Sequence, residues 1–491
     1  MRRNFAPAIP PHSACNALNF LSNLITKARN NPDYAAAVAT GYGLMALQLI
    51  IQVLLIPLYL RTLGTYTFGV LMILMAQVAF GYVFAGWLYN LLLRRFGESL
   101  AAGDTAGFSR LYVGGKVLLV GIGLAWGLGL LALEVFHPIF FEDAPPEMHR
   151  EILWAMCLSA LHLLLMYEVV VEHTIFAATK RQLVSNSVTI VSLLGFALCV
   201  VPWLLFGGGL IGVVGCFLVG DVAARIVAFV ALRRTGLHIN IRSAIGAKTK
   251  LWADMLAPHG RRYFVYALLA MALQADLLVV GFFGDPNVVA QFALVWKIAE
   301  IMILLLARIA QHLQPEFVSM DVTGDRKRLQ RVYGEAYLWM GLAAVILAVI
   351  YAAVGAQVVE LWVGAERVPH ETWLYPLAGA AIFWLGISRL PAILAQALSR
   401  MRPLMWIAIM ELSGKLVFIG YYFDELGTKT TLLAISLVHV CGIALAYWLL
   451  GRRLLGLWPF SPALGVTVSA SAEAAARDRA SAAEQRVKRR R

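Results

Sequence analysis

Long apolar stretches, separated by short polar segments, fill most of the chain. In lipid a helix closes its own backbone hydrogen bonds and needs about 20 mostly apolar residues to cross, so each long stretch predicts a transmembrane helix. The pattern predicts spans near 35–60, 70–93, 114–136, 152–173, 184–206, 209–232, 263–284, 288–311, 335–355, 373–397, 404–423 and 429–450. The sequence therefore predicts an all-α polytopic membrane protein with about twelve transmembrane helices.

The composition agrees with a membrane protein. Of the 491 residues, 60% are hydrophobic and only 14% are charged, whereas soluble domains average about 25% charged residues. The five cysteines occur singly, with no CxxC pair. We therefore expect no metal site, no disulfide framework and no cofactor.

Basic residues are concentrated in alternate loops. Because lysine and arginine resist translocation, the basic loops are expected in the cytoplasm, together with both termini. The opposite loops are acidic. This distribution explains the net charge of +13 without a nucleic-acid partner. The groups in the basic loops are Arg94/Arg95/Arg110, Lys180/Arg181, Arg233–Arg262, Arg326–Arg331 and Arg400/Arg402. The acidic residues of the opposite loops are Glu142, Asp143, Asp285, Glu366, Glu371, Asp424 and Glu425.

These boundaries divide the chain into five parts. Residues 1–34 form a cytoplasmic N-terminal segment in which 14–28 has the spacing of an interfacial helix or of a simple helical cap. The N-terminal bundle covers 35–232, a basic cytoplasmic linker 233–262, and the C-terminal bundle 263–450. The basic tail 451–491 is expected to be partly disordered and in reach of anionic membrane lipids.

The two halves resemble each other at an offset of about 220 residues. Glu98–Asp104 resembles Val318–Asp325, each after the second helix of its half, and Thr179-Lys180 recurs as Ser399-Arg400. An even number of helices per half makes this a parallel repeat. We therefore predict two pseudo-symmetric six-helix bundles around a central cavity, the architecture of an alternating-access transporter.

Ionisable residues inside the spans are the candidates for function, because a charge in the bilayer is costly. Lys297, Glu300, Arg308 and Gln311 fall within about 80° on one helix face. This stripe is predicted to line the cavity with cations. The alternatives are a simple pair between Lys297 and Glu300, and Arg308 reaching for the interface.

Other spans add further candidates. Arg389 lies two residues before Pro391, which predicts a kink. Glu411 and Lys415 have the spacing of an i,i+4 pair.

Acidic residues raise the question of ion coupling. Asp276 has no basic neighbour within four residues, so it could couple transport to protons or sodium or pair with a neighbouring helix. Asp221 and Arg225 have i,i+4 spacing and predict a second pair. Glu172 is expected to reach water near a helix end. The first half is otherwise expected to be poor in charge at mid-membrane depth.

Short motifs resemble a known family. The segment Ile56–Gly69, which contains Arg61-Thr-Leu-Gly64, resembles the first-helix signature of bacterial polysaccharide flippases. These are O-antigen and lipid-linked oligosaccharide translocases of the multidrug/oligosaccharidyl-lipid/polysaccharide exporter superfamily. Gln274–Gly284 is similar to the family's seventh helix, and Leu361–Gly364 also fits its pattern.

The resemblance implies a non-enzymatic transporter in the bacterial inner membrane. It implies flipping of an undecaprenyl-pyrophosphate-linked glycan to the periplasmic leaflet, with proton or sodium coupling and with glycan polymerase or assembly proteins as partners. By the same resemblance the cavity cations are Lys297, Arg308, Arg389 and Lys415, and the coupling candidates are Asp276, Glu300 and Glu411.

The alternatives are a multidrug or small-molecule cation antiporter of the same superfamily, a non-transporting scaffold for glycan-assembly enzymes, and a membrane polysaccharide polymerase or ligase. Such an enzyme typically needs a long periplasmic loop, and no outer loop exceeds roughly twenty residues.

Overall fold

All the regular structure in the described part of the chain is helical. The computed structural model describes residues 32–136, 140–141, 144–237, 239, 260–369, 371 and 373–457. The elements are α2 (Pro32–Thr62), α3 (Gly64–Ala102), α4 (Thr105–Phe136), α5 (Pro146–Ala178), α6 (Gln182–Leu205), α7 (Leu210–Arg233), α10 (Gly260–Phe283), α11 (Pro286–Val322), α12 (Arg326–Val363), η1 (Ala365–Arg367), α13 (Leu374–Ala397), α14 (Met401–Leu426), α15 (Lys429–Val438), η2 (His439–Ile443) and α16 (Ala444–Leu454).

These helices confirm a multi-pass membrane protein. Among the described residues, 11 helices are long and apolar enough to cross a membrane, and α10 contributes a shorter apolar run, Gln274–Phe283. The candidate interfacial helix 14–28, most of the linker 233–262 and most of the tail 451–491 lie outside the described residues.

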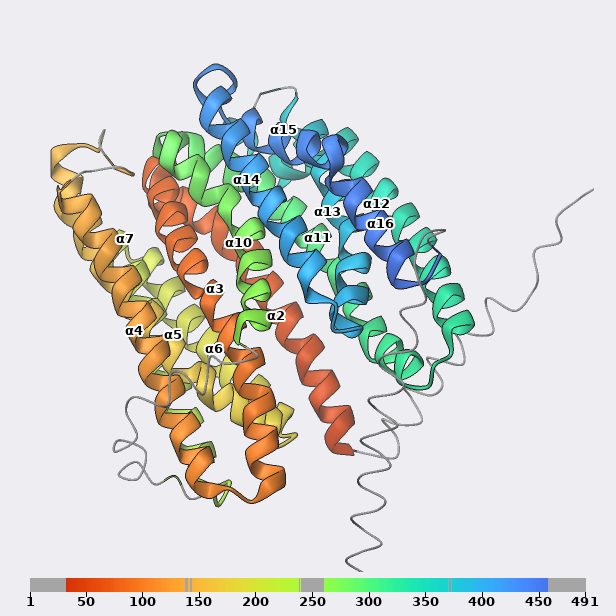
Figure 1. Cartoon of the computed structure of the whole chain (residues 1–491). Helices are drawn as coiled ribbons and strands as arrows, with labels where there is room; N and C mark the ends of the chain where they lie inside the picture. The colour runs from red at the N-terminus through yellow and green to blue at the C-terminus, as the bar shows by residue number, and fades with distance from the viewer. Residues whose placement is uncertain are drawn as a thin grey trace, which may run out of the picture.

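The helices form two halves that pack in the same way. In the N-terminal lobe (α2–α7), α2 packs on α6, α3 on α5, α4 on α5 and α6 on α7. In the C-terminal lobe (α10–α16), the corresponding pairs are α10 on α14, α11 on α13, α12 on α13 and α14 on α15. The two lobes lie side by side in Figure 1. The predicted pair of six-helix bundles is confirmed.

The turns repeat along with the helices. Gly103 and Gly324 end the second helix of each lobe with φ of 67° and 72°, a left-handed conformation that glycine adopts without strain. Lys180 and Ser399 take the same conformation between the fourth and fifth helices of each lobe, with φ of 60° and 55°. The sequence echoes at these positions therefore mark equivalent turns.

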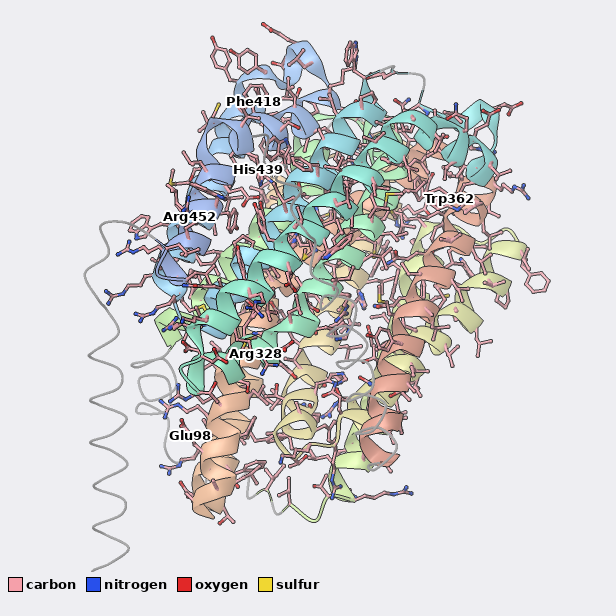
Figure 2. The ribbon with its side chains drawn as sticks, turned by 90° about the vertical axis from the view of Figure 1, so that its right-hand side faces the viewer. Glu98, Arg328, Trp362, Phe418, His439 and Arg452 are labelled. Carbon is pink, nitrogen blue, oxygen red and sulfur yellow. The ribbon has the colours of Figure 1, made fainter. Side chains whose placement is uncertain are left out.

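The molecule has two chemically different ends. The end formed by the α3–α4, α5–α6, α11–α12 and α13–α14 turns carries the basic loops and is called the basic end. The other, which carries Asp285, Glu366 and Glu371, is called the acidic end. In Figure 2, Glu98 and Arg328 mark the basic end and Phe418 lies towards the acidic end.

The two lobes share one hydrophobic core. The N-terminal lobe contributes to it mainly from the half that lies nearer the acidic end, called its acidic half; the other half is called its basic half. Phe141, Leu204 and Phe68 of that half belong to the same buried cluster as Val280 and Leu432 of the C-terminal lobe. The basic half of the N-terminal lobe has a separate core. Gly69 permits the close approach, because a Cβ there would overlap the carbonyl oxygen of Pro286. The two lobes are thus fastened at the acidic end.

The last span is interrupted. The helix from Lys429 to Leu454 contains a π-helical turn, His439–Ile443, in which Gly442 has φ 156° and ψ −23°. Such a turn breaks the regular backbone hydrogen-bond ladder and kinks the helix. The kink places His439 inside the C-terminal lobe, where it is fully buried.

Candidate functional site

The four polar residues of the stripe on α11 (Lys297, Glu300, Arg308 and Gln311) form contacts with one another. Lys297 Nζ lies 2.8 Å from Glu300 Oε2, the i,i+3 pair that the spacing allowed. Arg308 donates from a terminal nitrogen to Gln311 Oε1 at 3.1 Å, and its side chain is exposed. The charge of Lys297 is therefore offset by Glu300, while Arg308 is exposed and has a neutral amide as its hydrogen-bond partner.

The surface that carries Arg308 faces the other lobe. His312, one helical turn beyond Arg308, stacks on Tyr42 of α2 with ring centroids 5.7 Å apart. The two side chains also share a hydrogen bond of 2.5 Å. Residues four apart lie on one face of a helix. Arg308 thus lies on the α11 face turned towards α2 in the basic half, where the N-terminal lobe has its own core.

A second group of charges is buried within the C-terminal lobe. Lys415 Nζ of α14 lies 2.6 Å from Asp276 Oδ1 of α10, and each side chain is only 1% exposed. Glu411, one turn before Lys415, is also buried. The alternative that Asp276 pairs with a neighbouring helix is confirmed, and the pair fastens α10 to α14.

Arg389 lies near this pair and forms no ion pair within the described part of the chain. Glu411 and Tyr447 are the groups that act on it electrostatically. Its Nε is enclosed and has no hydrogen-bond partner among the described residues. His439 donates from Nδ1 to the carbonyl oxygen of Ile435 at 2.8 Å. Arg389, Glu411 and His439 therefore lie close together in one polar cluster inside the C-terminal lobe. The sequence analysis did not include His439 among the candidates.

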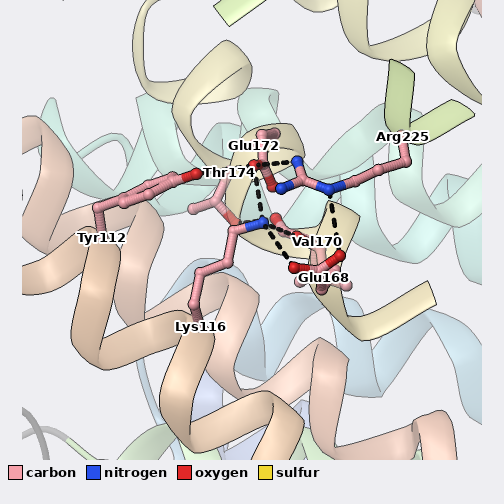
Figure 3. A network of polar contacts seen from close by, with 7 residues as sticks. All are labelled: Tyr112, Lys116, Glu168, Val170, Glu172, Thr174 and Arg225. Atoms are coloured by element: carbon pink, nitrogen blue, oxygen red, sulfur yellow. Dashed lines mark hydrogen bonds and ion pairs between the residues drawn. The ribbon is translucent and has the colours of Figure 1, made fainter. Parts of the chain in front are cut away.

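The N-terminal lobe contains a charge network that the sequence analysis missed. In Figure 3, Lys116 and Tyr112 of α4 and Arg225 of α7 converge on Glu168 and Glu172 of α5. Lys116 Nζ lies 2.8 Å from Glu172 Oε1, and Arg225 approaches Glu172 at 2.9 Å and Glu168 at 3.1 Å. Tyr112 donates to Glu172 at 3.0 Å. The network crosslinks three helices and balances two cations against two carboxylates.

Two expectations for this lobe are wrong. Arg225 does not pair with Asp221, which instead lies 2.5 Å from His162 Nδ1. Glu172 does not reach water, because it is fully buried. In each case the partner comes from a helix about 50 to 60 residues away in sequence, so spacing along one helix could not reveal it.

The described residues contain no group of three or more histidine, cysteine or acidic side chains placed to hold a metal ion. Exposed Arg308 can attract an anion at the junction of the lobes, whereas the buried pairs tie helices together.

Comparison with solved structures identifies the fold of this chain. No family model and no curated protein matches the sequence. An inward-facing multidrug resistance MATE family transporter of the MOP superfamily superposes with a TM-score of 0.70 and 14% identity, covering 83% of this chain and 94% of that one. The chain has the MATE transporter fold.

Two further structures support the same MATE fold. An outward-facing MATE family transporter gives a TM-score of 0.62 at 13% identity, over 88% of this chain and 98% of that one. A MOP superfamily transporter from Pyrococcus furiosus, described by a binding pocket of reversed polarity that suggests a different function, gives 0.59 at 14% identity, over 86% and 96%. The predicted superfamily is supported at the level of fold, and membership of the polysaccharide flippases stays a prediction.

Proposed function

We propose that this protein is an inner-membrane transporter that flips an undecaprenyl-pyrophosphate-linked oligosaccharide from the cytoplasmic to the periplasmic leaflet. The observation that carries the proposal is Arg308, an exposed cation on the α11 face turned towards α2. An arginine at that position can bind a phosphate with two parallel hydrogen bonds. The motif resemblance and the MATE fold supply the lipid-linked glycan and the alternating movement.

The arrangement of the cores suggests how the lobes move. They share a core through the acidic half of the N-terminal lobe, and this lobe has a separate core in its basic half. With the basic end in the cytoplasm, as the loop charges predict, the anionic headgroup enters between the lobes from the side where its precursor is made. Rocking of one lobe against the other then exposes it at the acidic end.

Coupling to protons or sodium is part of the proposal, and the structure constrains it. Asp276 is held by Lys415 and Glu300 by Lys297. A proton or sodium ion bound at either acid therefore has to displace a lysine. Glu411, close to Arg389, is the third coupling candidate, and Lys415 and Arg389 act on the substrate only if the lobe opens towards them.

The experiment is deletion of the gene in its host, with complementation by wild type, Arg308→Ala, Arg308→Lys and Arg328→Ala. Arg328 is the matched control, because it is an exposed arginine at the same end, paired with Glu316. We expect the deletion to lower surface polysaccharide and to accumulate its lipid-linked precursor. Wild type, Arg308→Lys and the control should restore export, and Arg308→Ala should not.

The second candidate is a multidrug or cation antiporter, favoured by the fold likeness to multidrug resistance MATE transporters. If it is right, deletion of the gene should leave the amount of surface polysaccharide unchanged and should raise the sensitivity of the cells to cationic drugs. The exposed Arg308 on the inter-lobe surface argues against it, because a cation in the path repels cationic substrates.

A further inference from the structure

A pocket of about 400 Å³ lies in the C-terminal lobe at the acidic end. It is formed by the last turns of α12, the segment around η1 and the start of α13. Arg308 lies in the basic half of α11, so the pocket is separate from the stripe described above. Its volume falls in the range of sites that take small molecules or lipid headgroups.

The walls of this pocket change from apolar to polar along α12. Ala352 and Ala356 form an apolar floor, followed by Gln357 and Glu360. Ala352 and Glu360 are eight residues apart, or about 12 Å along the helix. Because the apolar span of α12 ends at Val363, the polar part lies at headgroup level and the alanine floor lies deeper, beside the hydrocarbon. This gradient matches an amphiphile rather than a fully polar solute.

The polar part offers hydrogen-bond acceptors with few partners of their own. Glu360 is exposed, and no ion pair reaches it within the described part of the chain. Glu371 is already engaged by Lys429 Nζ at 3.3 Å. Tyr375 lines the pocket and is only 5% exposed, yet its hydroxyl has no partner among the described residues. The Tyr375 ring therefore closes one wall of the pocket, and the accessible acceptors are those of Glu360 and Gln357.

We propose that this pocket binds the headgroup of a membrane lipid that carries a primary ammonium group. An ammonium has N–H donors, which suit the carboxylate of Glu360 and the amide oxygen of Gln357, both exposed residues that line the pocket. The lipid's glycerol and acyl chain lie along Ala352 and Ala356. A quaternary choline headgroup has no N–H to donate, so the pocket discriminates between the two lipids. The proposal does not depend on which substrate the protein transports.

The test is native mass spectrometry of the full-length protein, delipidated in detergent and titrated with phosphatidylethanolamine, with phosphatidylcholine or with free ethanolamine. We expect phosphatidylethanolamine to bind about fivefold more tightly than phosphatidylcholine, as one additional hydrogen bond to a carboxylate allows. Glu360→Gln, which keeps an acceptor oxygen but loses the charge that strengthens this hydrogen bond, should lower that preference, and Ala356→Phe should lower the affinity for both lipids. Glu335→Gln is the matched control, because Glu335 is an exposed acid near the basic end of the same helix.

Three results would overturn the proposal. Wild type could bind both lipids equally, or Glu360→Gln could keep the preference of wild type. Free ethanolamine could also compete at the same concentration as the lipid, which would identify a soluble amine as the ligand. Gln357→Leu, which removes the second accessible acceptor of the pocket, checks the site independently of charge and should weaken phosphatidylethanolamine binding in folded protein.

Discussion

Breaking the buried ion pair between Asp276 and Lys415 should destabilise the protein more than any exposed pair does. The two side chains are 2.6 Å apart and each is 1% exposed, so loss of one leaves the other charge buried without its ion-pair counterpart. Removing one member of such a pair costs about 3–5 kcal/mol, whereas replacing both by apolar residues of similar volume is close to neutral. We therefore expect Asp276→Leu and Lys415→Met each to cost about 3–5 kcal/mol, and the double variant to lie within about 2 kcal/mol of wild type.

The assay is reversible unfolding in mixed micelles, with SDS as denaturant and helical circular dichroism as the signal. The matched control is the pair Lys297 and Glu300, at 2.8 Å with side chains 23% and 28% exposed. Its single variants, Lys297→Met and Glu300→Gln, should each cost under about 1 kcal/mol. If the single variants at Asp276 and Lys415 also cost under about 1 kcal/mol and add in the double variant, the pair is hydrated and the reasoning from burial fails.

Three further predictions follow from the packing of the lobes. Glu172→Gln, which removes the carboxylate shared in the N-terminal network, should cost about 3 kcal/mol in the same SDS titration; an unchanged midpoint would contradict a buried network. Gly69→Leu should disturb the joint between the lobes, because its side chain meets the Pro286 carbonyl. It should abolish export while the protein still inserts, and normal export would refute a close joint. Tyr42→Cys with His312→Cys, in a background without the native cysteines, should be linked by a bifunctional thiol reagent with a reducible spacer, and the link should stop export until it is cleaved; transport by the crosslinked protein would show that the lobes need not move apart there.

The sequence predicts the helices well because burial in lipid demands long apolar runs. It underestimates their length, however. The predicted span 70–93 lies within α3 (Gly64–Ala102), and 335–355 lies within α12 (Arg326–Val363). Polar turns outside the hydrocarbon continue the same hydrogen-bond ladder, and hydropathy carries no signal for them. The kink at Gly442 was missed because the apolar run continues through it.

The candidate site was only partly predictable for a different reason. Helical spacing identified Lys297 with Glu300, since both lie on one helix. It gave the wrong partner for Arg225 and offered no specific partner for Asp276, because those partners come from other helices. The signal available was that Glu168, Glu172, Lys116 and Arg225 are all too costly to bury alone. That signal predicts that partners exist, and only the fold shows which ones.

The measurement that tests the account most directly is flipping in proteoliposomes. Purified protein is reconstituted with a fluorescent polyprenyl-pyrophosphate-linked sugar, and the fraction exposed to a membrane-impermeant quencher is followed with time. We predict that wild type accelerates flipping over empty vesicles and that Arg308→Ala slows it about tenfold, as loss of one charge-assisted contact implies, while Arg308→Lys, which keeps the charge but not the two parallel hydrogen bonds, gives an intermediate rate. Flipping no faster than in empty vesicles, together with uptake of an organic cation by the same vesicles, would contradict the account.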